Sequence, residues 1–100
     1  MFTVLAKKEF SLTQKIRWLR LFMRAGYDQR FNSIIGMIYD FIPTKTPIIV
    51  DIGANVGNFT RGCTQQSKKA QLILAIEPSH YVFPILEFWS KIWSCKNTNI

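Results

Sequence analysis

The segment 51–57, with the sequence DIGANVG, has the residue types of a ligand-binding turn between a strand and a helix. Glycine permits positive φ and lets a ligand approach the main chain without a Cβ in the way. The N-terminus of the following helix offers unpaired N–H groups and a partial positive charge, which suit a carboxylate or another electron-rich group. Asp51, at the end of the strand, could meet an ammonium group directly or through water. The segment therefore predicts a ligand site formed by Asp51, Gly53, Ala54, Asn55 and Gly57.

Spacing separates three ligand classes that use such a turn. A phosphate-binding P-loop needs GxxxxGK followed by Ser or Thr, but Cys63 stands where the lysine belongs after Gly57 and Gly62. The dinucleotide fingerprint needs GxGxxG, whose second glycine lets the pyrophosphate approach. Here Asn55 and Asn58 stand in the second and third glycine positions. The class that remains is an adenosyl ligand without phosphate, such as S-adenosylmethionine.

A second carboxylate, Glu77, stands 20 residues after Gly57 at the end of the next apolar run. An acidic residue there can accept hydrogen bonds from both hydroxyls of a ribose, because a carboxylate has two oxygens and about four lone-pair sites. Two simpler interpretations stay open: the glycines could serve only the turn, and Glu77 could be a solvated loop acid. Their combination on two strand ends favours an adenosyl-binding site.

The hydrophobic pattern predicts a sheet that would bring these residues together. Residues 48–52 and 72–76 are short, largely apolar runs without alternation, typical of strands buried on both faces of a parallel sheet. Helical patterns cover 10–26, 29–41, the stretch from Gly57 to about Ser67, and a last helix that begins near Pro84. Such alternation predicts an α/β fold whose ligands lie at the carboxyl ends of the strands.

The first helices form a predicted helical extension, residues 1–47, ahead of a domain over residues 48–100. In the first helix we expect an apolar stripe to be buried and a separate stripe of arginines to lie beside it. The apolar stripe is Leu12, Ile16, Leu19 and Met23, and the arginines are Arg17, Arg20 and Arg24. Gly26 should end this helix, and Asp28 should cap the next one. In the last helix the expected core stripe is Ile85, Phe88, Trp89, Ile92 and Trp93.

The formal net charge is +7, and residues 1–47 hold eight Lys or Arg against three Asp or Glu. A basic helix of this kind either contacts an anionic partner, such as a membrane or nucleic acid, or is simply solvated. For nucleic acid there is no further indication. Peripheral membrane contact stays open, because basic helices with aromatic residues favour that interface.

Cys63 and Cys95 form no CxxC pair, and the chain has a single histidine, so neither a disulfide framework nor a zinc site is indicated. No run approaches the ~18 apolar residues of a spanning helix, and the N-terminus lacks the pattern of a signal peptide. We therefore expect reduced thiols and a cytoplasmic location.

The residues of the turn also resemble a known family. Residues 50–60 are similar to the opening motif of FkbM-family methyltransferases, and Ile76-Glu77-Pro78, with Phe83 and Leu86 following, resembles that family's second motif. The resemblance covers about residues 48–100. It implies a Rossmann-like class I methyltransferase core with S-adenosyl-L-methionine as cofactor. Asp51, Gly53, Asn55 and Gly57 would line the methionine side, and Glu77 would hold the ribose. Pro84 departs from the family pattern and implies a longer loop over residues 79–83.

The family implies methyl transfer to an oxygen or nitrogen nucleophile of a small-molecule or sugar acceptor. We expect the 100 residues to be the N-terminal half of such a core, because a third strand is due where the chain stops, and to have little activity alone. Two alternatives are a basic-helix binding module and a pseudo-enzyme that retains cofactor binding. No catalytic residue is assigned: His80 could be a general base or simply polar surface.

Overall fold

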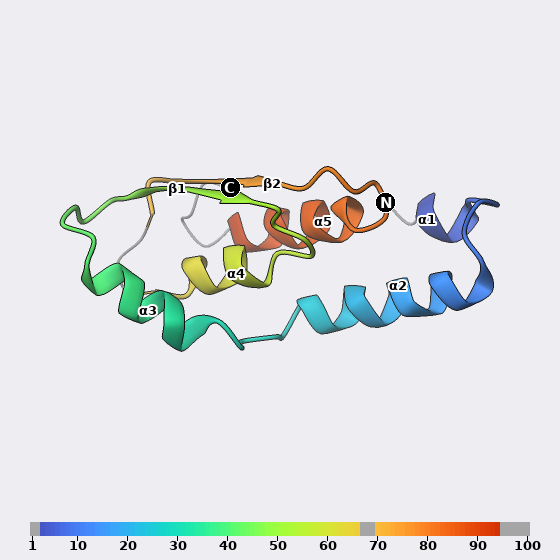
Figure 1. Ribbon diagram of the computed structural model, residues 1–100, viewed down its shortest axis with the longest axis horizontal. Coiled ribbons are helices and arrows are strands. Elements are labelled where there is room, and N and C mark those ends of the chain that lie inside the picture. Colours follow the sequence, from blue (N-terminus) through green and yellow to red (C-terminus); the bar gives the residue numbers. More distant parts are fainter. Residues whose placement is uncertain (1–2, 67–69, 95–100) are drawn as a thin grey trace.

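The computed structural model describes residues 3–66 and 70–94 (Figure 1). In this part of the chain two parallel strands and five helices form a small mixed α/β arrangement. In chain order the elements are α1 (Thr3–Ala6), α2 (Leu12–Ala25), α3 (Asn32–Asp40), β1 (Ile48–Ile52), α4 (Asn58–Thr64), β2 (Leu72–Ile76) and α5 (Phe83–Ser94). The molecule is elongated, 48 × 21 × 21 Å, and Figure 1 shows α3, α4 and α5 below the strands and α2 beyond the strand ends. The predicted parallel strands and their bounds are confirmed.

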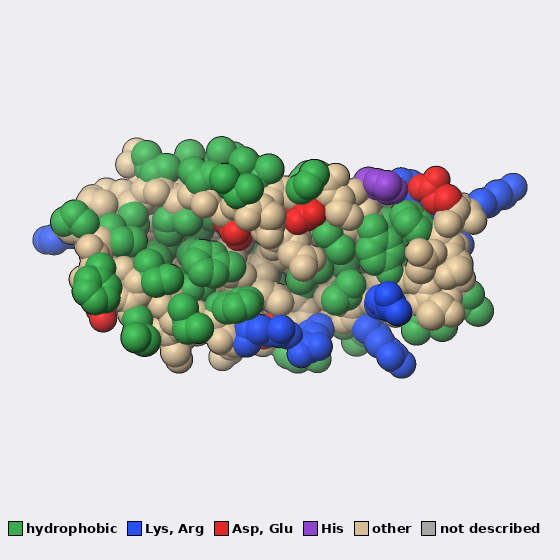
Figure 2. Space-filling model, in the orientation of Figure 1, with side chains coloured by type: hydrophobic (Ala, Val, Ile, Leu, Met, Phe, Trp, Pro, Cys, Tyr) green, Lys and Arg blue, Asp and Glu red, His purple; other side chains and the backbone are tan. Residues whose placement is uncertain are grey.

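The two strands are covered on one face only. They pair in parallel from Ile48 opposite Leu72 to Ile52 opposite Ile76. Because side chains alternate along a strand, Ile73 is buried under the helices while its neighbours point outward. The outward face carries six aliphatic side chains, each between 39% and 79% exposed: Ile48, Val50, Ile52, Leu72, Leu74 and Ile76 (Figure 2, upper edge). The expectation of strands buried on both faces is therefore wrong for the described residues.

Helix α2 begins with a capping box, which the sequence pattern S-x-x-Q indicates. The Gln14 amide donates to Ser11 Oγ over 3.2 Å, and the Ser11 amide donates back to Gln14 Oε1 over 2.7 Å. The helix ends at Gly26, as expected, but in an ordinary right-handed conformation. A Cβ at Gly26 would lie 2.5 Å from the Trp89 ring, so close packing explains the glycine.

The buried side of α2 is not the predicted one. Trp18 and Ala25 are buried, whereas the predicted stripe of Leu12, Ile16, Leu19 and Met23 faces outward. The Trp18 indole donates to the Tyr81 carbonyl over 2.7 Å, which ties α2 to the segment before α5. A helix that is apolar around most of its circumference can bury either side. In α2 the side that carries Trp18 packs inward.

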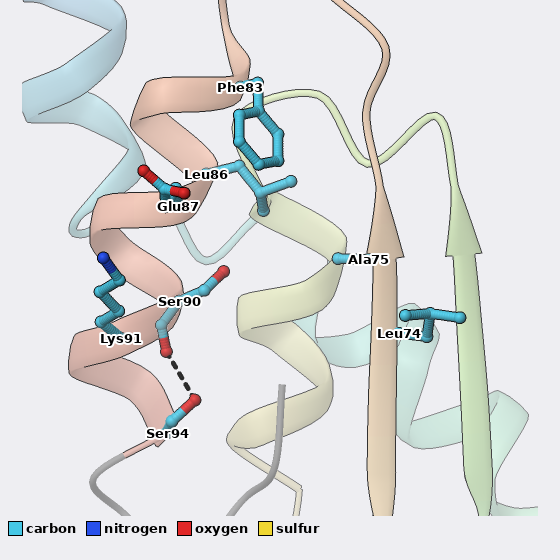
Figure 3. Close-up of a pocket in the computed structure, with 8 residues that line it drawn as sticks. All are labelled: Leu74, Ala75, Phe83, Leu86, Glu87, Ser90, Lys91 and Ser94. Atoms are coloured by element: carbon cyan, nitrogen blue, oxygen red, sulfur yellow. Dashed lines mark hydrogen bonds between the residues drawn. The ribbon is translucent and has the colours of Figure 1, made fainter. Parts of the chain in front are cut away.

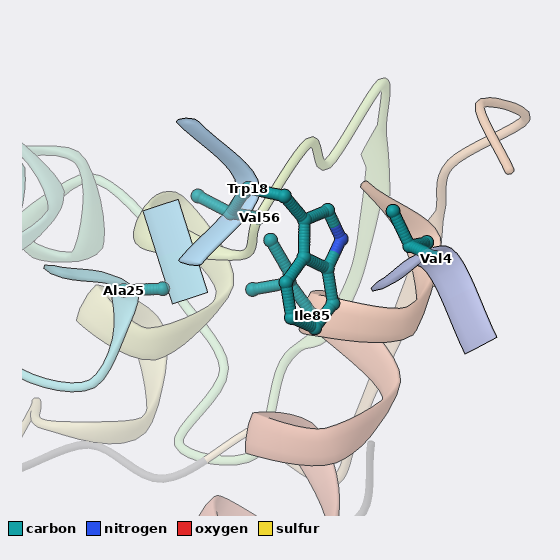
Figure 4. Close-up of a cluster of buried hydrophobic side chains, with 5 residues drawn as sticks. All are labelled: Val4, Trp18, Ala25, Val56 and Ile85. Carbon is teal, nitrogen blue, oxygen red and sulfur yellow. The ribbon is translucent and has the colours of Figure 1, made fainter. Parts of the chain in front are cut away.

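Two buried clusters hold the helices and the sheet together. The first joins α1, α2, the turn after β1, and α5 through Val4, Trp18, Ala25, Val56 and Ile85 (Figure 4). The second joins α3, α4 and β2 through Ile35, Tyr39, Cys63, Ala70 and Ile73. Each cluster combines side chains from before and after residue 47. Both predicted segments therefore contribute to each cluster.

Two predicted details of the helices are wrong. Helix α3 begins at Asn32, its N-cap residue is Phe31, and Asp28 does not cap it. Instead the Asp28 carboxylate accepts the Arg30 amide over 3.0 Å, which shapes the link between α2 and α3. In α5, Ile85, Leu86 and Trp93 are buried but Ile92 is exposed, so the core stripe is narrower than predicted. The start of α5 is one residue from the predicted Pro84.

Candidate functional site

The turn after β1 has the backbone conformation expected from its glycines. Gly53, Asn55 and Gly57 have φ of 74°, 55° and 97°, all in the left-handed region. Glycine adopts such values readily, and asparagine does so more often than most residues. This sequence of left-handed residues turns the chain sharply from β1 into α4, whose N-cap residue is Gly57.

Backbone amides of the turn are used within the protein. The Gly53 and Ala54 amides both donate to the Ile76 carbonyl over 2.9 Å, and the Gly57 amide donates to the Ala54 carbonyl over 2.9 Å. The Asn55 amide donates to Glu77 Oε1 over 2.7 Å. These bonds join the end of β1 to the end of β2. Four amides of the turn therefore already donate within the protein.

Glu77 links two loops through its two carboxylate oxygens. Besides the bond from Asn55, its Oε2 accepts the Ser79 amide over 2.9 Å. Each oxygen of a carboxylate has about two lone-pair sites, so each retains one for a further donor. Glu77 is half-buried at the strand end, where the sequence predicts a ribose-binding acid.

Asp51 points toward α4 at the same edge of the sheet. Its Oδ2 accepts a hydrogen bond of 2.7 Å from the hydroxyl of Thr60, which is fully buried. This bond fixes the orientation of the carboxylate and leaves Oδ1 for a ligand or water. Residue spacing alone does not predict this bond, because the direction in which Thr60 points depends on how the turn enters α4.

A hollow of about 290 Å³ brings four of the six predicted site residues together. Asp51, Gly53, Ala54 and Asn55 line it along with Arg30, Phe31, Val56, Asn58 and Phe59. Its volume is near the lower end of the ~300–1,000 Å³ typical of small-molecule sites. Gly57 lies outside the lining, buried against Leu86 and Trp93, and Glu77 is not among the lining residues either. Four of the predicted site residues therefore line the hollow, and the other two, Gly57 and Glu77, do not.

A set of polar residues that the sequence did not assign to the site lies between this hollow and α2. Asp28 Oδ2 lies 2.6 Å from Arg30 Nη2 and 3.6 Å from Arg24 Nε. It also accepts a weak 3.5 Å bond from the Asn58 amide group, and Arg61 Nη1 donates to the Asp28 carbonyl over 2.6 Å. The hydrogen bond from the Arg30 side chain lowers the pKa of Asp28 below its ordinary value. We call these five residues the Asp28 cluster.

A smaller hollow of about 210 Å³ adjoins the first one on the side of α2. Leu21, Arg24 and Ala25 of α2 line it, and it shares Arg30, Asn55, Val56 and Asn58 with the larger hollow. Another hollow, of about 290 Å³, lies between β2 and α5 and is lined mainly by aliphatic and polar side chains of α5 (Figure 3). It contains none of the predicted site residues.

Other residues considered from the sequence lie away from the hollow. His80 is largely exposed, with Nε2 3.7 Å from Glu9 Oε1, so it faces the N-terminal segment instead of the site. Cys63 is a buried free thiol, and burial raises its pKa to about 11, which makes it a poor nucleophile at neutral pH. Cys95 lies outside the described residues.

Two features are absent from the described residues. Among residues 3–66 and 70–94, no group of three or more His, Cys, Asp or Glu side chains could hold a metal ion. No helix in that part of the chain is both long enough and apolar enough to cross a membrane.

Comparisons with protein-family models, with curated proteins and with solved structures find no match to this chain. The candidate site therefore consists of the turn after β1, the hollow that this turn borders, and Glu77 beside them.

Proposed function

We propose that the turn 51–57 and Glu77 bind S-adenosylmethionine, and that the chain is part of a Rossmann-like methyltransferase of the FkbM type. The observation that carries this proposal is the 2.7 Å bond between the Asn55 amide and the Glu77 carboxylate. It holds the carboxyl ends of two neighbouring parallel strands together, and ligands of such sheets bind at that edge.

The surroundings of Gly53 fit a ligand that approaches the main chain. A Cβ built on Gly53 would meet no heavy atom within 4 Å, so the space beside this residue is open. Asp51 lines the same hollow and has one carboxylate oxygen not engaged by Thr60. An ammonium group of the ligand would pair with that oxygen, as the sequence pattern predicts.

The hydrogen bonding of the turn favours a ligand without phosphate. A phosphate loop works by directing free amides at the anion, and here the amides of Gly53, Ala54, Asn55 and Gly57 donate within the protein. The adenosyl class chosen from spacing is therefore also favoured by the geometry. The remaining lone pairs of Glu77 would accept the two hydroxyls of the ribose.

When bound, S-adenosylmethionine supplies an activated methyl group, and transfer then depends mainly on aligning the acceptor. We propose an oxygen or nitrogen nucleophile as the acceptor, on a small molecule or a sugar. Catalytic residues are not part of the proposal. A cofactor-binding pseudo-enzyme would share the site and differ only in lacking transfer.

Calorimetric titration with S-adenosylhomocysteine tests the binding site. The wild-type chain should bind. Glu77→Ala should weaken binding by about tenfold or more, since a hydrogen bond to a charged group contributes about 1.5–3 kcal/mol. Gly53→Val should also weaken it, because the new side chain would fill the open space beside the turn. Asp40→Asn is the matched control: it removes an exposed carboxylate at the end of α3 and should titrate like the wild type. Equal heats for all four chains would reject the cofactor site.

Methyl transfer needs its own measurement. A radiolabelled methyl donor, incubated with the chain and a panel of hydroxyl- and amine-bearing acceptors, distinguishes a transferase from a binding protein. Binding in the calorimeter without any transfer would favour the pseudo-enzyme, and turnover would establish the activity. Thermal unfolding of each variant shows whether a lost signal reflects the site or the fold.

A further inference from the structure

The outward side of α2 carries an apolar stripe that the fold leaves uncovered. Leu12, Ile16, Leu19 and Met23 are 73%, 46%, 39% and 67% exposed. Their spacing of i, i+4, i+7 and i+11 puts them on one side of the helix, so they form a continuous line and not scattered surface residues. A contiguous exposed apolar surface of this kind marks an interaction site.

The same helix is positively charged and carries no acidic side chain. Its basic residues are Lys15, Arg17, Arg20 and Arg24. By helical spacing the three arginines lie on one flank of the apolar stripe and Lys15 on the other. Arg24 forms an ion pair with Asp28, and Arg17 and Arg20 are exposed. Figure 2 shows Lys and Arg side chains along the lower edge, over α2 and the link that follows it.

Contacts with the rest of the protein hold α2 in place. Its capping box closes the N-terminal end, and Trp18 and Ala25 bury the opposite side in the core cluster with Val56 and Ile85. The stripe is therefore available without any refolding of α2. A preformed helix about 21 Å long, with an apolar line between basic flanks, matches a surface that is apolar inside and anionic outside.

We propose that α2 docks the protein on an anionic lipid bilayer, lying in the plane of the interface. The aliphatic side chains would enter the boundary between head groups and acyl chains, and the arginines and Lys15 would contact the head-group phosphates. Nucleic acid would attract the same arginines but would leave the apolar stripe in water. The exposure of Leu12 and Met23 therefore favours lipid. Apart from Arg24, which also belongs to the Asp28 cluster, this surface lies away from the proposed cofactor site.

Cosedimentation of the full chain with vesicles tests the proposal. Binding should be strong to phosphatidylcholine mixed with phosphatidylserine, weak to phosphatidylcholine alone, and reduced by added salt. Arg17→Gln with Arg20→Gln should weaken binding by roughly thirtyfold, since each arginine near an anionic surface contributes about fivefold. Leu12→Ser with Met23→Ser should weaken it by about tenfold, through the loss of buried apolar area.

A matched control uses exposed aliphatic residues elsewhere. Val50→Thr with Leu74→Thr changes the open face of the sheet and should leave vesicle binding unchanged. Equal loss in this control and in the Leu12/Met23 pair would overturn the assignment to α2. So would unchanged vesicle binding in the Leu12/Met23 pair together with salt-sensitive binding to duplex DNA, which would indicate nucleic acid. Loss of self-association in that pair, without vesicle binding by the wild type, would indicate a second copy of the chain.

Discussion

Replacing Gly57 with alanine should destabilise the fold, because two separate costs meet at this residue. Its φ of 97° is left-handed, which costs an L-residue about 1–2 kcal/mol. A Cβ there would also lie 2.8 Å from Leu86 Cδ1 and 2.9 Å from Trp93 Cζ3, and both side chains are buried. Overpacking of this kind costs about 1–3 kcal/mol. After the small gain from a stiffer unfolded chain, the free energy of unfolding should fall by about 2–4 kcal/mol.

Alanine variants of two other glycines distinguish the cost of the left-handed conformation from the cost of overpacking. Gly53 also has positive φ, but its Cβ would meet nothing within 4 Å, so alanine there should cost about 1 kcal/mol through conformation alone. Gly36 lies inside α3, where a Cβ would meet only the Gln66 Oε1 atom at 3.2 Å. Alanine favours a helix interior by about 0.5–1 kcal/mol, so Gly36→Ala should be at least as stable as the wild type.

Thermal unfolding followed by circular dichroism measures all three variants. In a domain of this size, 1 kcal/mol shifts Tm by about 4–8 °C, so Gly57→Ala should melt roughly 10–25 °C below the wild type. Gly53→Ala should lie between the two. Equal Tm values for Gly57→Ala and Gly53→Ala would refute the contribution of packing, and a wild-type Tm in Gly57→Ala would refute both costs.

Three further outcomes are expected. Asp28→Ala should lower the free energy of unfolding by about 1–2 kcal/mol. Because the fold lowers the pKa of Asp28, this stability is present above the ordinary carboxyl pKa and should disappear as pH falls through the folded pKa. Measuring Tm of the wild type and the variant across acid pH would show this loss. Burial raises the pKa of Cys63 to about 11, so between the ordinary thiol pKa and pH 11 only the unfolded thiol ionises, and the free energy of unfolding should fall. Cys63→Ala should therefore lose less Tm at alkaline pH than the wild type, and identical pH profiles of the two proteins would contradict this. Ile73→Ala should cost about 2–5 kcal/mol and Leu74→Ala under about 1, measured by urea unfolding, since the first side chain is buried and the second faces outward.

The local pattern of the sequence was enough to locate the strands and the turn. Residues 48–52 and 72–76 are strands as predicted, and the positive φ values fall on Gly53, Asn55 and Gly57. The prediction that both strand ends meet at one edge is confirmed by the bonds of the Gly53 and Asn55 amides to Ile76 and Glu77. These features are short-range, since a β-branched run and a glycine turn each depend on a few adjacent residues.

The Asp28 cluster shows why part of the candidate site could not be predicted. Its members come from α2, from the link before α3, and from α4, and no spacing rule relates Asp28 to Asn58 or Arg61. Asp28 also has the residue type of a helix cap, and the sequence offered that simpler role. Arg24 and Arg30 are near Asp28 in the sequence, whereas only the packing of α4 against this link brings Asn58 and Arg61 to it.

The sequence by itself determined the order of the elements from α2 to α5, the turn at Gly53 and Gly57, and the placement of Asp51 and Glu77 on neighbouring strand ends, but it did not indicate α1. Tertiary structure alone decided which side of α2 is buried, which face of the sheet is covered, and that Gly57 packs against α5 instead of lining the hollow. The physical reason is that periodicity shows where apolar side chains gather on an element. Which of several apolar surfaces is buried depends on the shapes of the partners, such as Trp18 against Ile85.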